Sequence, residues 1–119
     1  MLIDFNSDKA IYIQLAEGLE DAILAGAFPE ETKIPSTTEI SVSYKINPAT
    51  ALKGVNLLVN DQIVYKKRGV GMFVSEGAVE KIMEKRKISF VETYIKNLLK
   101  EAAKLGIPKS EIIAMIERS

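Results

Sequence analysis

The chain has 119 residues, of which 47% are hydrophobic, and its 16 Lys and Arg balance 16 Asp and Glu. This length allows one domain of about 100–150 residues, or a smaller domain with an appendage. Because the chain has neither His nor Cys, we exclude disulfides, Ser–His or Cys–His catalysis and a zinc site of ordinary ligands. We find no signal peptide and no apolar run near 18 residues, and therefore expect a cytoplasmic binding protein without membrane contact, metal or cofactor.

The balanced total conceals an uneven distribution of charge along the chain. Residues 1–44 carry a net charge of −6, residues 45–75 carry +4 and residues 76–119 carry +2. A net charge of zero argues weakly against a nucleic-acid partner, whereas a basic middle third favours one. Whether the charges favour a nucleic-acid partner therefore depends on which predicted elements carry the basic residues.

Apolar residues at three- and four-residue steps predict a first helix over residues 9–25. We expect Ser7 or Asp8 to cap its start and Gly26 to follow its end in the left-handed conformation. Three acidic residues are expected together on its exposed face, namely Glu17, Glu20 and Asp21. No base or nucleophile lies near them in the sequence, so they give catalysis little support.

The next two predicted helices begin with strong capping signals. Ser36 and Glu39 have the spacing of a capping box at the start of a short helix. Asn47 followed by Pro48 predicts another start just beyond, because asparagine caps helices and proline suits the first helical position. This third helix is expected to run from Pro48 to about Val59.

After the third helix the apolar period falls to two residues, which predicts strands at 63–66 and 72–75. The residues between these strands include Gly69 and Gly71, so the two strands are expected to form a hairpin. Three helices followed by a hairpin define a domain over residues 9–77.

Residues 78–119 are predicted to form a helical tail. An apolar stripe runs from Val79 to Leu105, Gly106 ends it, and residues 110–117 form a last short helix. A segment this short needs a partner surface, because domains below about 40 residues rarely close a core alone. The tail either pairs with a second copy or packs back on its own domain. The residues expected to dimerise are Ile82, Met83, Phe90, Val91, Tyr94, Ile95, Leu98, Leu99, Leu105, Ile112, Ile113 and Ile116.

The expected fold is thus α+β and mainly α, with the components of a helix-turn-helix in its first domain. In that motif the second helix enters the major groove, which is about 12 Å wide and accepts a leading face that is not bulky. Thr50 and Lys53 can reach phosphates or bases, and Ala49 can contact a thymine methyl group. The alternative is that Asn47 and Pro48 simply make a good helix start.

The hairpin tip carries three successive cations, Lys66, Lys67 and Arg68, as expected of a wing that lies along a DNA groove. The alternative is an ordinary turn whose lysines protect an edge strand. The predicted DNA-binding residues are Ser36, Thr37, Thr38, Asn47, Pro48, Ala49, Thr50, Lys53, Lys66, Lys67, Arg68, Gly69 and Gly71.

The sequence resembles the GntR family of bacterial transcription regulators over residues 11–75. The matching segments are 11–16, 23–26, 34–36, 46–50 and 65–74, the last with a Gly-x-Gly-x-Phe-Val ending. This resemblance implies a winged helix-turn-helix and a sequence-specific regulator that binds double-stranded DNA.

The entry at residues 47–50 and the short tail resemble the YtrA subfamily in particular. That resemblance implies a homodimeric repressor at an inverted-repeat operator, and often control of a transporter operon. Many family members carry arginines where this chain has Thr38, Pro48 and Leu52, so their base preference does not transfer. Two other functions stay open: a winged-helix module that binds a protein, and a regulator whose tail binds a small-molecule effector, for which Phe90 and Tyr94 can line a pocket.

Overall fold

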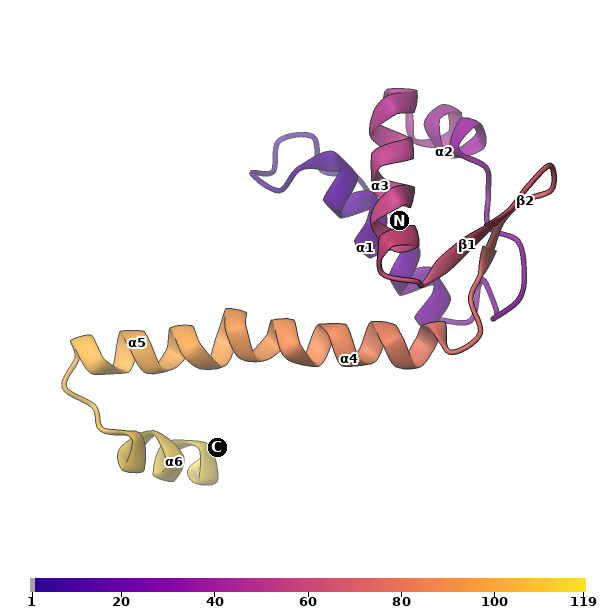
Figure 1. The fold of residues 1–119 in the computed structure, drawn as a ribbon. Coiled ribbons are helices and arrows are strands. Elements are labelled where there is room, and N and C mark those ends of the chain that lie inside the picture. Colours follow the sequence, from indigo (N-terminus) through magenta and orange to yellow (C-terminus); the bar gives the residue numbers. More distant parts are fainter. Residues whose placement is uncertain (1) are drawn as a thin grey trace. The chain divides into compact units, whose positions relative to one another are not determined.

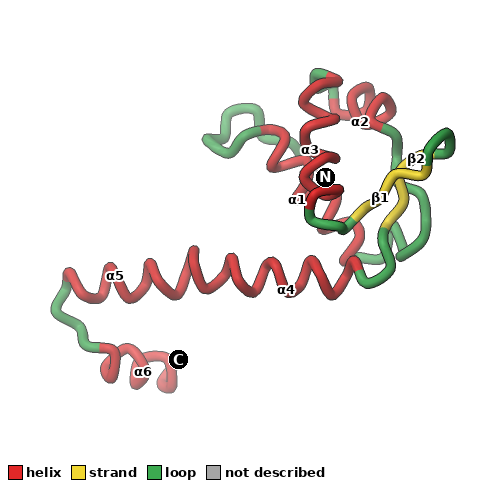
Figure 2. The backbone as a smooth tube through the Cα atoms, viewed as in Figure 1, coloured by secondary structure: helices red, strands yellow, loops and turns green. Residues whose placement is uncertain are grey.

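The computed structural model describes residues 2–119 and divides the chain into two compact units. The first unit ends at Ile82, and the second comprises Met83–Ser119. Three helices and a two-stranded hairpin make up most of the first unit, and the second consists of helices with a short loop at residues 105–108 between the last two (Figure 1). The two strands of the hairpin are drawn in yellow and the turn that joins them in green (Figure 2), and they are the paired strands among the described residues.

The first helix, α1 (Ile11–Leu24), begins without the side-chain cap that the sequence predicted. Neither Ser7 nor Asp8 caps it, and the Ser7 hydroxyl instead accepts a hydrogen bond from the Lys9 N–H at 3.1 Å. The Gln14 amide group donates to the Lys9 carbonyl oxygen at 2.8 Å and so ties the preceding segment to the helix.

One of the three acids on α1 is buried, contrary to the prediction. Glu20 is 1% exposed and lies beside the core residue Leu19, whereas Asp21 is exposed. Glu17 pairs with Lys9 at 2.9 Å. The apolar stripe of α1 is therefore wider than the sequence pattern indicated, and it includes the position of a charged residue.

The helices α2 (Thr37–Tyr44) and α3 (Pro48–Asn60) begin where the sequence predicted. The Ser36 hydroxyl accepts from the Glu39 N–H at 3.1 Å, and the Glu39 carboxylate accepts from the Ser36 N–H at 3.2 Å, which completes the capping box. The Asn47 side chain accepts from the Ala49 N–H at 2.7 Å and caps α3.

The turn between α2 and α3 is held by buried groups. Lys45 has the left-handed conformation, at φ 54° and ψ 47°, which costs a non-glycine residue about 1 kcal/mol. Ile46 is buried next to it, and its carbonyl oxygen accepts from the buried Ser41 hydroxyl at 2.7 Å. Burial of Ile46 and this hydrogen bond offset the strain, so the two helices form a fixed helix-turn-helix.

The hairpin consists of β1 (Val64–Lys67) and β2 (Gly71–Val74), paired antiparallel with Val64 opposite Val74 and Lys67 opposite Gly71. Relative to the prediction, β1 starts one residue later and β2 one residue earlier. Ile63, where the predicted strand began, is fully buried in the core, and its carbonyl oxygen accepts from the Ser75 N–H at 2.9 Å just outside the paired strands. The apolar pattern alone cannot separate such a residue from the strand that follows it.

The core of the first unit lies between α1, α3 and the hairpin. Close packing of α1 on α3 depends on Gly54, because a Cβ atom there would lie 2.8 Å from the Leu15 Cδ2 and 2.9 Å from the Tyr12 carbonyl oxygen. Leu15 and Leu58 are both fully buried in this core. The absence of a side chain at Gly54 thus sets how near the two helices approach.

The first unit extends past residue 77, where the predicted domain ended, into the start of α4 (Ala78–Phe90). Ile82, predicted to dimerise, is 0% exposed and belongs to this core. The Glu30 carboxylate accepts from the N–H groups of Gly77 and Val79, at 2.7 and 3.3 Å, and so caps the first turn of α4. Val79, Ile82 and Met83 continue the apolar pattern across this boundary, so the sequence does not mark where the core ends.

In the second unit α4 continues into a π-helical turn, η1 (Val91–Ile95), and then into α5 (Lys96–Lys104). Gly106, at φ 72°, ends this helix, and α6 (Lys109–Arg118) follows. The expected long helix and short final helix are both present, whereas the π-helical turn was not predicted. No helix of the described chain has both the length and the apolar character needed to cross a membrane.

Candidate nucleic-acid interface

The helix-turn-helix exposes most of the side chains that the sequence assigned to DNA, and the others are half-buried. Thr38, Asn47, Pro48 and Ala49 are exposed, and Thr50 is half-buried on α3. The leading face of α3 therefore consists of small polar and apolar side chains, as entry into a major groove requires.

Two of the predicted contact residues already use their side chains as helix caps. The hydroxyl of Ser36 belongs to the capping box, and its backbone N–H and hydroxyl hold the pKa of Glu39 below the ordinary value. The Asn47 side-chain oxygen is bound to the Ala49 N–H. Ser36 and Asn47 therefore first position the helices, and Thr37, Thr38 and Thr50 are better placed to bind a ligand.

Lys53 is held at the side of α3 by an aromatic ring. Its ammonium group lies 4.1 Å from the centroid of the Tyr12 ring on α1, within range of a cation–π interaction. A shallow groove of about 330 Å³ follows the outer face of α3, lined by Ala49, Leu52, Lys53, Asn56, Leu57 and Asn60. Sequence reasoning missed Tyr12, because an aromatic residue in an apolar stripe at helical spacing is normally assigned to the core.

The hairpin presents its cations to solvent at the turn. Lys66, Lys67 and Arg68 are exposed, and the Val70 N–H closes the turn by donating to the Lys67 carbonyl oxygen at 2.9 Å. Gly69 has φ +75°, which allows this tight turn. The Lys67 ammonium group lies 4.5 Å from the centroid of the Phe73 ring, within range of a cation–π interaction. One of the three cations therefore already has a partner on β2.

The outer edge of β2 is covered by residues 31–34, which the sequence assigned only to a connector. Lys33 forms an isolated bridge with Phe73. The Tyr65 hydroxyl on β1 donates to the Glu31 carboxylate at 2.7 Å, which raises the pKa of Tyr65. The wing is thereby joined to the segment that leads into α2, and this link had no periodic signal in the sequence.

Most residues predicted to dimerise are exposed on the second unit. Phe90 and Tyr94 pack together with their ring centroids 5.3 Å apart, yet Tyr94 is 63% exposed. The exposed residues of the predicted set are Met83, Phe90, Val91, Tyr94, Ile95, Leu98, Leu105, Ile113 and Ile116, while Leu99 is half-buried and Ile112 is buried within the unit. An apolar surface of this extent is typical of an interaction site.

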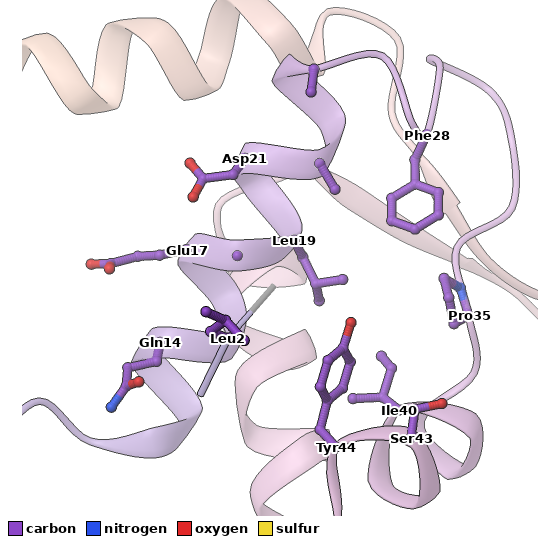
Figure 3. A pocket seen from close by; sticks show the side chains of 13 residues that line it. Leu2, Gln14, Glu17, Leu19, Asp21, Phe28, Pro35, Ile40, Ser43 and Tyr44 are labelled. Atoms are coloured by element: carbon purple, nitrogen blue, oxygen red, sulfur yellow. The ribbon is translucent and has the colours of Figure 1, made fainter. Parts of the chain in front are cut away.

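A cavity of about 650 Å³ lies in the first unit between α1, α2 and the segment at 28–35 (Figure 3). Phe28 lies across it from Ile40 and Tyr44, which are side by side on α2 (Figure 3). Its remaining lining is Leu2, Gln14, Glu17, Gly18, Leu19, Asp21, Ala22, Ala25, Pro35 and Ser43. Neither Phe90 nor Tyr94 contributes to it. No group of side chains suited to hold a metal ion occurs in the described part of the chain.

Two helices joined by a fixed turn and followed by a β-hairpin on the same core constitute a winged helix-turn-helix, a class of DNA-binding domain. Residues 11–74 match the family of bacterial regulatory proteins named gntR, and the chain belongs to this family. Its members are DNA-binding regulators and not enzymes, which confirms the prediction made from the sequence.

Comparison with individual proteins supports the same assignment. The transcriptional repressor YtrA of Bacillus subtilis is 29% identical over 105 residues, which cover 88% of this chain and 80% of YtrA. The structure of a GntR-family regulator from Bacteroides thetaiotaomicron is 35% identical and has a TM-score of 0.76, covering 92% of this chain and 95% of that one. BusR of S. agalactiae, solved in complex with its promoter DNA, shares the fold at 24% identity and a TM-score of 0.58, over 92% of this chain and 54% of BusR.

Proposed function

We propose that the protein is a homodimeric repressor that binds an inverted-repeat operator through α3 and the wing. The observation that carries this proposal is the exposure, on one compact unit, of a small-residue leading face on α3 and of the three wing cations. Such a face fits the major groove, and cations at a hairpin tip suit phosphates. The residues proposed to contact DNA are the DNA-binding residues predicted from the sequence, of which Ser36 is the first and Gly71 the last.

The contact residues have different proposed roles. The wing cations Lys66 and Arg68 bind phosphates and so contribute affinity for any duplex. Thr50 and Lys53 lie on α3, where base edges come within reach, and they contribute sequence preference. The base preference of this chain is proposed to differ from that of many relatives, because Thr38 and Pro48 stand where those relatives have arginine.

The dimer is proposed to form through the second unit. The tail buries only Ala102 and Ile112 within itself and leaves the apolar face containing Leu98 and Tyr94 in solvent. Burying that face against a second copy removes it from water. A symmetric dimer then presents two α3 helices to half-sites separated by one DNA turn or a multiple of it.

The finer assignment follows the likeness to YtrA, a protein named as a transcriptional repressor. We propose repression, rather than activation, and control of a transporter operon on that basis. The expected location is the cytoplasm, where the chromosomal operator lies.

The test is an electrophoretic shift of the DNA upstream of the protein's own gene, followed by an anisotropy titration over a range of salt concentrations. We expect specific retardation and an affinity that falls steeply as salt rises, because each phosphate contact displaces condensed counterions. Scrambled DNA of the same composition is the control. A salt-independent signal, or equal retardation of both duplexes, would contradict a sequence-specific DNA-binding function and favour a module that binds a protein partner.

Light scattering over a range of protein concentrations tests the dimer separately. We expect a mass close to twice that of the chain, which is 13.1 kDa. A monomer at all concentrations that still binds a palindrome would contradict the proposed role of the tail.

A further inference from the structure

We infer that Lys33 is a further DNA-backbone contact, which extends the wing to a third chain segment. This inference rests on the proposed DNA-binding function and adds to it a cation outside both the helix-turn-helix and the hairpin. In the sequence Lys33 is an isolated cation in an acidic third of the chain, with Glu30 and Glu31 close before it.

The backbone of residues 31–34 is fixed against the wing by three hydrogen bonds. The Glu31 N–H donates to the Val74 carbonyl oxygen at 2.8 Å, and the Val74 N–H donates to the Thr32 carbonyl oxygen at 2.9 Å. The Ile34 N–H donates to the Met72 carbonyl oxygen at 2.9 Å, and Ile34 itself is buried. Lys33 therefore lies at a defined place beside β2.

The side chain of Lys33 extends along the wing, across Gly71. A Cβ atom at position 71 would lie 2.6 Å from the Lys33 Cε and 3.4 Å from its Nζ. Gly71 also has φ +144°, a conformation that residues with a side chain rarely adopt. The glycine thus serves the backbone of the wing and at the same time leaves room for the methylene groups of Lys33.

The ammonium group of Lys33 is exposed and, within the described chain, makes no hydrogen bond or ion pair. Lys53 and Lys67, in contrast, lie over the rings of Tyr12 and Phe73, and Lys9 is paired with Glu17. Lys33 attracts the Glu39 carboxylate at longer range, but that carboxylate is already bound to the Ser36 N–H.

These observations define a cation with a fixed backbone, a directed side chain and an ammonium group available for a ligand. The exposed wing cations Lys66 and Arg68 lie on β1 and in the turn of the same hairpin, across β2 from Lys33. The ligand that matches exposed cations on one wing, beside the helix proposed to read DNA, is the phosphate backbone, which lysine binds as a point charge. Lys33 contributes affinity to every duplex and no preference among bases.

The experiment compares the wild-type chain with Lys33→Gln in anisotropy titrations on a specific and a scrambled duplex, between 50 and 200 mM salt. Loss of one phosphate contact lowers the slope of log affinity against log salt by about 0.9. The ratio of wild-type to variant affinity should accordingly fall about threefold over that range, on both duplexes alike. Lys33→Arg should retain the wild-type slope, and Lys9→Gln is the control for removal of one charge elsewhere on the same unit.

A wild-type slope in Lys33→Gln would overturn the inference while leaving the proposed DNA-binding function intact. Absence of salt-dependent binding by the wild-type chain would overturn both. As a second measurement that needs no variant, acylation of surface lysines is compared with and without the duplex. We expect DNA to protect Lys33 and leave Lys9 reactive, and equal reactivity of Lys33 in both samples would also overturn the inference.

Discussion

The two compact units bury their apolar side chains to very different extents. In the first unit Leu15, Leu58 and Ile82 are all completely buried. In the second unit Leu98 is 41% exposed, although it belongs to an apolar stripe with the same helical spacing. The same helical pattern therefore predicts the intramolecular core in one unit and an uncovered surface in the other. The first unit therefore closes its core within one chain, whereas the second leaves exposed the apolar face that is proposed to pair with a second copy.

The largest expected effect comes from equal truncations in the two units. Leu58→Ala should lower the free energy of unfolding by about 2–5 kcal/mol, because it leaves a cavity in a closed core. Leu98→Ala should change the free energy of unfolding of the monomer by less than about 0.5 kcal/mol, because the Leu98 side chain is already partly exposed to water. Urea denaturation at a concentration below dimer formation measures both. Equal losses would show that the tail is packed in the monomer as tightly as the first unit.

A charge placed on the exposed apolar face of the tail tests whether this face forms the proposed dimer interface. Leu98→Asp should raise the dimer dissociation constant by at least about 100-fold, or roughly 2.7 kcal/mol, because the carboxylate would be buried without a counter-charge. Light scattering over a dilution series measures the change. Lys100→Ala, on the same helix, is the control and should leave the dimer unchanged. A dimer of wild-type strength in Leu98→Asp would exclude this face as the interface.

Within the first unit, the close approach of α1 and α3 can be tested at one position. Gly54→Ala should destabilise the fold by about 1–3 kcal/mol, since its new Cβ meets the Tyr12 carbonyl oxygen, which is backbone and cannot rotate away. Thermal unfolding measures the loss. Asn56→Ala, on the exposed side of α3, should stay within about 0.5 kcal/mol of the wild type. A neutral Gly54→Ala would mean that the two helices can separate without cost.

The smallest expected effect is a pH dependence at the start of α2. The Ser36 N–H and hydroxyl hold the pKa of Glu39 below its ordinary value in the folded state, so the charged carboxylate stabilises the fold at neutral pH. This contribution is lost as pH falls through the folded-state pKa. Glu39→Gln should therefore unfold at a lower temperature than the wild type at pH 7, and the gap should narrow in acid. A gap that is constant with pH would mean that the carboxylate charge plays no part in the capping box.

Local chemistry explains why much of the fold could be predicted. A cap such as that of Ser36 and Glu39 is made by residues three apart, so the sequence alone contains both partners. Gly26 is another such case, with φ +85° just past the end of α1. The strand ends differ from the prediction by one residue, because an apolar residue such as Ile63 fits the strand pattern whether it belongs to the strand or to the core beside it.

Contacts between distant segments could not be predicted in this way. Glu20 has the charge of a surface residue, and its burial follows from how α1 packs, which no local pattern contains. The same holds for Lys53 over Tyr12, since the two residues meet only after α1 and α3 have packed. Ile82 is a further example, because the sequence shows an apolar stripe but not the surface that covers it.

The π-helical turn η1 has a consequence for how the tail tolerates insertions and deletions. Phe90, Tyr94 and Leu98 are spaced four residues apart, and in a regular α-helix each such step rotates a side chain by about 40° beyond a full turn. A π-helical turn with i→i+5 hydrogen bonds holds one residue more than the α-helical turn that it replaces. Deleting one residue from 91–95 would therefore restore a regular helix with little rotation of the residues downstream, whereas the same deletion within α5 would rotate them by about 100°. The turn thus gives the tail a place at which its length can change while the apolar face of α5 keeps its direction.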